Sequence, residues 1–366
     1  MAEKKHTATA PEGPVTMKEI AAELGVSINT VHKAITGKPG VSDERRAQIQ
    51  AAAKAMGYHR NEVASSLRRK DVRVAVCLPG AEGEGASHNE ALWEGVRRFA
   101  KTPRAAGVSF EELPYEPGEY GELLATVEKR VSVGHDLAGL LAFAPPAGAE
   151  REALGRIAET GLPVELVDND CASIARLGAS ISDYRAAGQL MAEQALNLVA
   201  GRGADGEPIR ILLLAGDTHT DSNYLMARTF RNGMKAADTA IELEEIAGGQ
   251  ARAATVRREL ATKLATNDAP ALVCCVGAAA TQVAAETLPS AATRPLAIGC
   301  GVFPESAEAL RGGTFTNLIY QDRCTMVERA AETLAERVLW GTRPKRPVQS
   351  VGVDLVFKSN LNQYLA

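Results

Sequence analysis

The sequence has few aromatic residues and no long apolar run. Phe, Trp and Tyr make up 4% of its 366 residues, whereas glycine alone occurs 33 times. This composition favours helices packed closely on a parallel sheet over a β-sandwich. No stretch reaches the roughly 18 apolar residues of a membrane span. The N-terminal MAEKKHTATAPEGP carries charges but no apolar core segment, so we expect no signal peptide and a cytoplasmic protein.

Cysteine and catalytic motifs are equally sparse. The six cysteines form no C-x-x-C pair and have no partnering histidine cluster, which argues against a zinc site and against a disulfide framework. We find no G-x-S-x-G elbow and no Walker loop, and LPGAEGEGA lacks the G-x-G-x-x-G phosphate turn. The sequence therefore favours a non-enzymatic protein with no cofactor and no metal.

The formal net charge of −4 is also small, but it is unevenly distributed. Residues 1–70 contain twelve Lys or Arg against seven Asp or Glu, while the remainder contains 29 against 38. A basic N-terminal segment on an acidic body is compatible with local contact to nucleic acid. A chain of this length exceeds one ordinary core, so we expect two or three domains.

The stretch VTMKEIAAELGVSINTVHK, residues 15–33, predicts two short helices that meet at a tight corner. Thr16 and Glu19 have the spacing of a capping box, Gly25 can end the first helix in a left-handed conformation, and Ser27 can cap the second. Asn29, Thr30, His32 and Lys33 fall on the outer face of that second helix. Short polar and cationic side chains in this position suit base reading in the major groove. An ordinary helical hairpin in a core is the alternative.

A third helix follows, capped by Ser42, and ends at Gly57. It completes a small domain, 15–60, between a disordered tail at 1–14 and a hinge at 61–71. The expected core of this domain is apolar and comprises Ile20, Leu24, Val31, Ile35, Ile49 and Met56. In the hinge, NEVASSLRRK, Leu67 stands beside three cations, which suits a helix that orders on DNA, with the leucine between base steps and the cations on phosphate. A plain linker is the alternative.

From residue 15 to residue 70 the sequence resembles the head and hinge of the lactose-repressor family of bacterial transcription factors. The order and spacing of A-x-x-x-G-V-S-x-x-T-V, V-S-x-x-x-R-x-x-I, M-G-Y and N-x-V-A-x-x-L carry the match. The resemblance implies that Ile28, Asn29 and Lys33 read bases and that Leu67 enters the minor groove. His32 and Lys33 stand where the family usually has serine and arginine. The full set of expected DNA contacts is Thr16, Ser27, Ile28, Asn29, Thr30, His32, Lys33, Asn61, Ala64, Ser65, Leu67 and Arg68.

Beyond residue 72, short apolar runs alternate with helical patterns. Strands are expected at 72–78, 108–113, 137–143, 164–167, 209–214, 271–276, 296–300 and 353–357. Helices are expected at 91–100, 123–131, 185–200, 224–236, 255–265 and 324–340. This alternation predicts doubly wound parallel sheets in two lobes with a ligand cleft at their strand ends. We expect one lobe from about 72–180 and 315–342, and the other from about 181–314 and 343–358.

GLPVELVDND, SDYRAAGQLMAEQAL, ARTFRNGMKAA and NLIYQDR also resemble the family, as two lobes related to periplasmic sugar-binding proteins. The resemblance implies that Asp168, Asn169 and Gln321 reach the ligand. The family's arginine and acid correspond to Phe230 and Gly301, with Cys275 or Val276 at a third position. A one-residue shift of register would bring Arg231 into the site instead. Further ligand candidates are His88, Asn89, Trp93 and Arg228, while Asp183 is expected to cap a helix.

These features predict a ligand-responsive transcription regulator, more specifically a repressor, associated with the bacterial nucleoid. Its expected partners are a palindromic double-stranded DNA operator, a carbohydrate-related effector, and a second copy in a homodimer or a tetramer; no membrane partner is expected. Two alternatives remain: a solute-binding transport component on the same lobes, and an enzyme of sugar metabolism.

Overall fold

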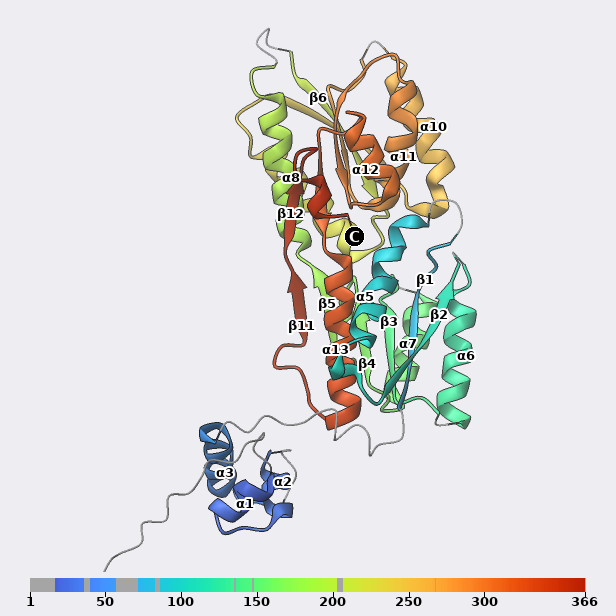
Figure 1. Cartoon of the computed structure of the whole chain (residues 1–366). Helices are drawn as coiled ribbons and strands as arrows, with labels where there is room; N and C mark the ends of the chain where they lie inside the picture. The colour runs from blue at the N-terminus through green and yellow to red at the C-terminus, as the bar shows by residue number, and fades with distance from the viewer. Residues whose placement is uncertain are drawn as a thin grey trace, which may run out of the picture. The chain divides into compact units, whose positions relative to one another are not determined.

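The computed structural model describes residues 17–35, 40–56, 72–82, 86–116, 118–134, 136–146, 148–202, 207–266 and 268–365. The chain divides into two compact units, residues Met1–Arg69 and Lys70–Ala366, which we call the head and the body (Figure 1). The expected tail at 1–14, the whole hinge at 61–71, and the expected DNA contacts Thr16, Asn61, Ala64, Ser65, Leu67 and Arg68 lie outside the described residues.

The head contains the three predicted helices, α1 (Met17–Glu23), α2 (Ile28–Ile35) and α3 (Asp43–Ala55). Gly25 has a φ of 60°, which places it in the left-handed region where glycine pays no side-chain penalty. The hydroxyl of Ser27 accepts from the backbone N–H of Thr30 at 3.0 Å, and Ser42 accepts from Arg45 N–H at 3.4 Å. Capping chemistry in the sequence therefore sets the helix starts.

The core of the head contains the six predicted apolar residues, joined by small and medium side chains. Ile20, Val31 and Ile49 are fully buried, and Leu24, Ile35 and Met56 pack against them. Arg46 of α3 adds a polar cross-link, because its guanidinium donates to the carbonyls of Lys33 at 3.0 Å and Ala34 at 3.3 Å. Charged donors on the free carbonyls at the C-terminal end of α2 fix its orientation against α3.

The first lobe of the body, the N lobe, is built on a six-stranded sheet of order β11-β5-β4-β3-β1-β2. Its strands run parallel and comprise β1 (Val72–Pro79), β2 (Val108–Tyr115), β3 (Gly139–Phe143), β4 (Val164–Val167), β5 (Gly178–Ser182) and β11 (Val348–Val351). Helices α5 (Glu90–Ala100) and α13 (Arg323–Trp340) supply the core on one face. Helices α6 (Tyr120–Val133) and α7 (Ala149–Glu159) supply it on the other.

The second lobe, the C lobe, repeats this plan with a sheet of order β12-β10-β9-β8-β6-β7. Its strands are β6 (Ile209–Gly216), β7 (Ile241–Ala247), β8 (Leu272–Cys275), β9 (Leu296–Cys300), β10 (Asn317–Gln321) and β12 (Val353–Val356), of which β12 runs antiparallel to β10. The α8 (Tyr184–Val199) and α9 (Asp221–Lys235) helices cover one face. The other face is covered by α10 (Ala253–Leu264), α11 (Ala278–Thr287) and α12 (Pro304–Arg311).

The two-lobed α/β architecture expected from the sequence is present, but two lobe boundaries were wrong. Strand β10 belongs to the C-lobe sheet and β11 to the N-lobe sheet, so residues 317–321 and 348–351 are exchanged relative to the expectation. The chain crosses between lobes at β5–α8, at β10–α13 and at β11–β12. Asp183 lies at the first crossing and caps α8, accepting from Ala186 N–H at 3.0 Å, as expected.

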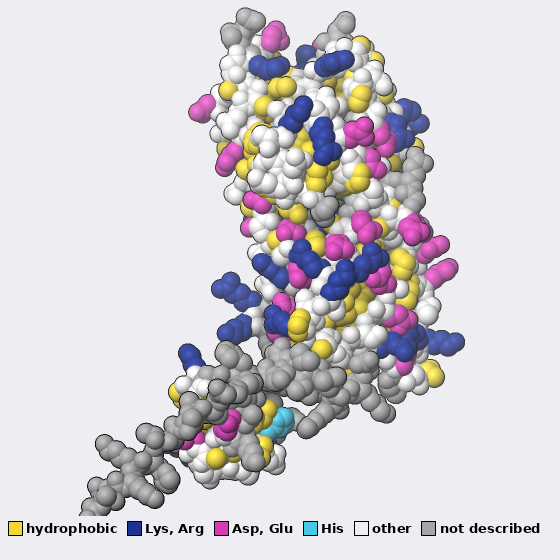
Figure 2. Space-filling model, viewed as in Figure 1, with side chains coloured by type: hydrophobic (Ala, Val, Ile, Leu, Met, Phe, Trp, Pro, Cys, Tyr) yellow, Lys and Arg dark blue, Asp and Glu magenta, His cyan; other side chains and the backbone are white. Residues whose placement is uncertain are grey.

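On the surface formed by α5 and α13, Figure 2 shows basic and acidic side chains interleaved rather than gathered by sign. Arg98 pairs with Glu328, and Arg104 pairs with Glu336 at 2.7 Å. Such a mixed surface offers no single-sign field for phosphate. Among the helices of the described segments, none has the length and apolar character that crossing a membrane requires.

Candidate functional site

The outer face of α2 presents the polar residues expected to contact DNA. Val31 and Ala34 are completely buried beneath this helix, whereas Ile28 is 51% exposed and Asn29 is also exposed. Thr30, His32 and Lys33 are half-buried. The Ser27 hydroxyl contacts both the backbone N–H and the hydroxyl of Thr30, so it stabilises the start of the helix that carries these groups.

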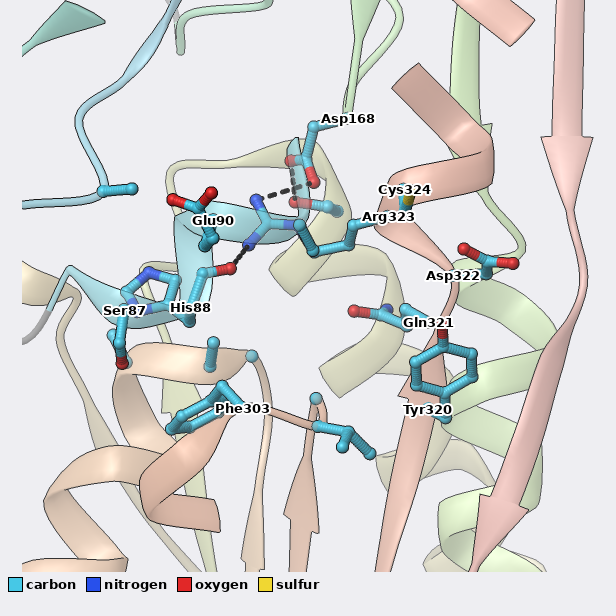
Figure 3. A pocket seen from close by; sticks show the side chains of 18 of the residues that line it. Ser87, His88, Glu90, Asp168, Phe303, Tyr320, Gln321, Asp322, Arg323 and Cys324 are labelled. Atoms are coloured by element: carbon cyan, nitrogen blue, oxygen red, sulfur yellow. Dashed lines mark hydrogen bonds and ion pairs between the residues drawn. The ribbon is translucent and has the colours of Figure 1, made fainter. Parts of the chain in front are cut away.

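A cavity of about 1040 Å³ lies between the two lobes of the body. Because the carboxyl ends of parallel strands meet at the same edge of a sheet, the residues after these strands line it. Five of the residues expected at a ligand site do so: His88, Asp168, Val276, Gly301 and Gln321. Figure 3 shows His88 and Asp168 with Arg323 between them, and Gln321 at the end of β10.

Asp168 and Arg323 form the polar centre of the cavity. Asp168 has a φ of 72°, unusual for a residue with a side chain. Its carboxylate accepts from the Tyr184 hydroxyl at 2.8 Å, Asn169 Nδ2 at 2.9 Å and the Ser222 hydroxyl at 3.3 Å. Arg323 lies 4.0 Å from this carboxylate, and the two side chains are only 16% and 14% exposed.

The remaining guanidinium contact of Arg323 fixes its direction. It donates to the backbone carbonyl of His88 at 3.2 Å. Burial, and then the charge of Asp168, raise the pKa of Tyr184 well above its usual value, so this hydroxyl stays protonated and donates. Contacts with Asp168 and with the His88 carbonyl hold Arg323 in place. The guanidinium has five N–H donors, so others remain for a ligand in the cavity that it lines.

On the C-lobe side of the cavity, three glycines expose backbone at the ends of strands. Gly216, Gly277 and Gly301, at the carboxyl ends of β6, β8 and β9, have φ values of 67°, 81° and 88° and line the cavity. A Cβ at Gly301 would lie 3.4 Å from the ring of Phe303. That distance is an ordinary contact, but a φ of 88° disfavours any residue with a side chain, so the acid that the family resemblance placed here would be strained by its backbone conformation.

Five of the expected ligand residues are buried instead. Asn89 donates to the Gly80 carbonyl at 2.9 Å, and Trp93 Nε1 donates to the Pro79 carbonyl at 2.9 Å. Cys275 and Phe230 are completely buried in C-lobe cores. Asn169, 4% exposed, contacts the other lobe. The expectation that these residues line the cleft was wrong. Asn89, Trp93, Cys275 and Asn169 each have a sequence neighbour in the cavity lining, which for Cys275 is the alternative Val276. Phe230 lies farther away, on the face of α9 that packs on the sheet.

The arginines of α9 do not enter the cavity either. Phe230 lies between Met226 and Met234 in sequence steps of four, so this face of the helix packs on the sheet. Arg231 pairs with Glu245 of β7 at 2.5 Å, and Arg228 is exposed outside the cavity lining. The alternative register with Arg231 in the site is therefore wrong as well.

The lobes touch each other at the rims of the cavity. Asn169 Oδ1 accepts from the backbone N–H of Ser222 at 2.6 Å, and Ser87 donates to Glu305 at 2.7 Å. The rings of His88 and Phe303 lie 6.0 Å apart. These contacts across the cleft hold the lobes together in this structure. Opening the cleft must break them.

Several cavity residues were missed from the sequence. Arg323 lies two residues after the expected Gln321 and carried a detectable signal, since it opens a helix after a strand end. Phe303 and Tyr184 had no such signal, because their positions depend on turns that the sequence does not specify. Within the described residues, no group of three His, Cys, Asp or Glu side chains is placed to hold a metal ion.

Both units of the chain match known protein families. Residues 82–341 match the periplasmic binding protein domain family, and residues 16–61 match the family described as bacterial regulatory proteins, lacI family. Over 54 residues the chain is 43% identical to the HTH-type transcriptional regulator MalR of Streptococcus pneumoniae, and over 71 residues it is 37% identical to AglR of Rhizobium meliloti. These matches span 15% and 19% of this chain, and only 16% and 20% of the relatives' lengths.

Solved structures share the fold of the body. A putative LacI transcriptional regulator from Bacteroides fragilis aligns with a TM-score of 0.68 at 17% identity, covering 81% of this chain and 100% of that one. GanP, a glucose-galactose binding protein from Geobacillus stearothermophilus, aligns with a TM-score of 0.67 at 16% identity, covering 80% and 99%. The chain therefore belongs to the periplasmic binding protein domain family, and it carries at residues 16–61 a helix-turn-helix head that matches the lacI family of bacterial regulatory proteins.

Proposed function

We propose that this regulator binds a palindromic operator as a homodimer, represses transcription in the cytoplasm, and responds to a carbohydrate-related effector in the interlobe cleft. The observation that carries the proposal is the combination, in one chain, of an exposed polar face on α2 with a cavity of about 1040 Å³ between two touching lobes. A reader of DNA and a closable ligand site together make a switch. We assign no catalytic step to the cleft.

The geometry of the head supports the dimer. One recognition helix spans only a few base pairs, whereas two heads related by a two-fold axis match a palindrome at one-turn spacing. Ile28, Asn29 and Lys33 are the proposed base-reading residues. A tetramer built from two such dimers would bind two operators by the same contacts.

The chemistry of the cleft supports a polyhydroxylated effector. Gln321, Asn223 and Arg323 offer hydrogen-bonding groups, while Phe143, Phe303 and Tyr320 offer aromatic surface, the mixture that binds polar rings with an apolar face. The names of similar proteins point the same way: MalI of Vibrio furnissii is a maltose regulon regulatory protein, and GanP binds glucose and galactose.

We propose linkage as the mechanism. An effector that bridges Arg323 in the N lobe and the backbone at Gly277 in the C lobe favours one lobe angle, since it contacts both lobes only in that arrangement. The altered lobe angle changes the spacing of the two heads and hence operator affinity. By reciprocity, operator binding changes effector affinity by the same factor.

The effector can be tested with an operator selected from random DNA by the full chain. We expect one of D-glucose, D-galactose, D-arabinose, myo-inositol and maltose to change operator affinity at least about fivefold, the lower range of allosteric coupling. Arg323→Ala should abolish that response. Arg329→Ala, on the same helix but outside the cavity lining, should retain it. Operator affinity indifferent to every compound of the panel would contradict the proposed carbohydrate effector.

The reading face can be tested on the same selected operator. Asn29→Ala and Lys33→Ala should each relax sequence preference at particular base pairs, with a loss of roughly 1 to 3 kcal/mol against the cognate site. Lys54→Ala, in the last turn of α3, is the control and should leave the preference unchanged. A uniform drop in affinity over all sequences would reassign Asn29 and Lys33 to phosphate contacts.

A further inference from the structure

The segment after β12 folds back as a compact turn on the C lobe. Leu361 is 1% exposed and lies in the core formed with α10, α11 and α12. Asn360 fixes the turn, because its side chain accepts from Phe357 N–H at 2.7 Å and donates to the Leu355 carbonyl at 3.2 Å. A short 3-10 helix (η5, Leu361–Gln363) continues from it. This anchoring gives the following residues a defined position.

Those following residues face the interlobe cleft. Gln363, Tyr364 and Leu365 all line the cavity, and Figure 1 places the C mark between the two lobes. The ring of Tyr364 lies edge-on against Tyr320, with centroids 4.8 Å apart. Tyr320 belongs to β10 and directly precedes Gln321, the last residue before the crossing to α13.

We propose that residues 363–365 form a wall of the ligand cleft and that Tyr364, held by Tyr320, is a specificity-determining residue that limits the width of the molecules admitted. The chemical class of the ligand rests on the proposed function, but the position of the wall does not. An edge-to-face aromatic pair is a rigid unit with few rotamers. Because the pair lines the same cavity as Asp168 and Arg323, it offers an apolar edge to a sugar ring bound there and excludes bulkier groups.

Cys324 provides a built-in reporter of cleft access. It lines the same cavity and is half-buried, whereas the other five cysteines are buried. Burial raises the pKa of its thiol to about 11, so its alkylation is slow and rates, rather than end points, are the quantity to compare. The full chain is treated with iodoacetamide, a small reagent, and with fluorescein-5-maleimide, a bulky one. Cys324→Ser identifies the labelled site.

The measured quantity is the ratio of the bulky to the small reagent's rate. Tyr364→Ala should raise this ratio about fivefold or more, the effect of removing roughly 1 kcal/mol of steric cost. Tyr364→Trp should lower it, and Tyr364→Phe, which keeps the ring, should leave it unchanged. Phe357→Ala, on the same segment but outside the cavity lining, is the matched control and should also leave the ratio unchanged.

If the ratio were the same in the wild type, Tyr364→Ala and Tyr364→Trp, the proposal that Tyr364 limits access to the cleft would be wrong. The opposite shifts expected for Ala and Trp separate blocking from loss of folding, because unfolding accelerates both reagents and exposes Cys274 as well. The carbohydrate panel tests a different statement. If no compound of the panel changed operator affinity, the proposed effector class would be wrong. The ratio of alkylation rates would still test whether Tyr364 limits access to the cleft.

Discussion

Gly95→Ala should destabilise the N lobe by roughly 1 to 3 kcal/mol, the cost of forcing extra atoms into a packed contact. Gly95 lies where α5 crosses α13. A Cβ there would be 2.4 Å from the Cys324 carbonyl oxygen and 2.9 Å from Val327 Cβ. Because the nearer atom belongs to the backbone of α13, the whole helix must move to make room. Both tryptophans, Trp93 and Trp340, lie on these two helices, so their fluorescence follows the unfolding directly.

The same substitution at Gly155 provides the control. Gly155 lies in α7 of the same lobe, and a Cβ there would meet nothing within 4 Å. Replacing glycine by alanine in an open helix position stabilises by about 0.5 to 1 kcal/mol. The two variants should therefore have opposite signs in equilibrium denaturation of the full chain. If Gly95→Ala matched Gly155→Ala, the close approach of α5 and α13 would be refuted.

This contact also concerns function, because α5 and α13 both begin at the cleft. Helix α13 starts with Arg323, and Glu90, the first residue of α5, lines the cavity. A displacement of α13 carries Arg323 with it. Gly188 has the equivalent position in the C lobe, where a Cβ would lie 2.4 Å from the Met226 carbonyl oxygen of α9.

Within residues 17–35 and 40–56, the three helices and the core of the head could be predicted from the sequence. Its helix ends depend on local chemistry, namely the hydroxyl of Ser27, the hydroxyl of Ser42 and the flexibility of Gly25, which is readable within a few residues. Its core follows from apolar spacing. The role of Arg46 was not predicted, because a guanidinium that reaches carbonyls of another helix depends on tertiary packing rather than on a local pattern.

In the body, the architecture was predictable but several elements were not. Strands β5, with sequence GASIS, and β7, with sequence IELEEIA, lack the apolar runs used to recognise buried strands. Strand β7 forms an edge of its sheet, where acidic residues can face solvent. Helices α7, α11 and α12 were likewise missed. The assignment of β10 and β11 to lobes depends on pairing between distant segments, which the sequence pattern does not contain.

In the cleft, too, some ligand-site residues could be predicted and others could not. The family resemblance correctly placed Asp168, Gln321 and Gly301 at the cavity, where the carboxyl ends of parallel strands meet. It failed for Cys275 and Asn169, whose neighbours Val276 and Asp168 line the cavity instead. A shift of one residue along the chain moves a side chain from the cavity into the core, as for Cys275, or into contact with the other lobe, as for Asn169. Sequence alone does not fix that displacement.

One ionisable side chain is buried in the otherwise apolar N-lobe core. Glu165 lies in β4 between apolar residues and is completely buried. Neither of its carboxyl oxygens has a hydrogen-bond partner among the described residues. Burial raises its pKa to about 8, with Arg176 opposing and Asp170 adding to the rise. At neutral pH the folded protein therefore holds this carboxyl largely in its protonated form.

Glu165→Gln should remove a pH dependence that the wild type carries. Between pH 4.5 and about 8, the native carboxyl keeps its proton while the unfolded chain releases it, so wild-type stability falls as the pH rises. The slope approaches about 1.4 kcal/mol per pH unit, which amounts to a difference of a few kcal/mol from the neutral variant by pH 8. Denaturant unfolding at pH 5 and pH 8, followed by tryptophan fluorescence, measures this difference. Glu159→Gln, at an exposed position of α7, should follow the wild type at both pH values. Parallel pH profiles for Glu165→Gln and the wild type would mean that the carboxyl ionises freely in the fold, and that the N-lobe core admits water or a cation at β4.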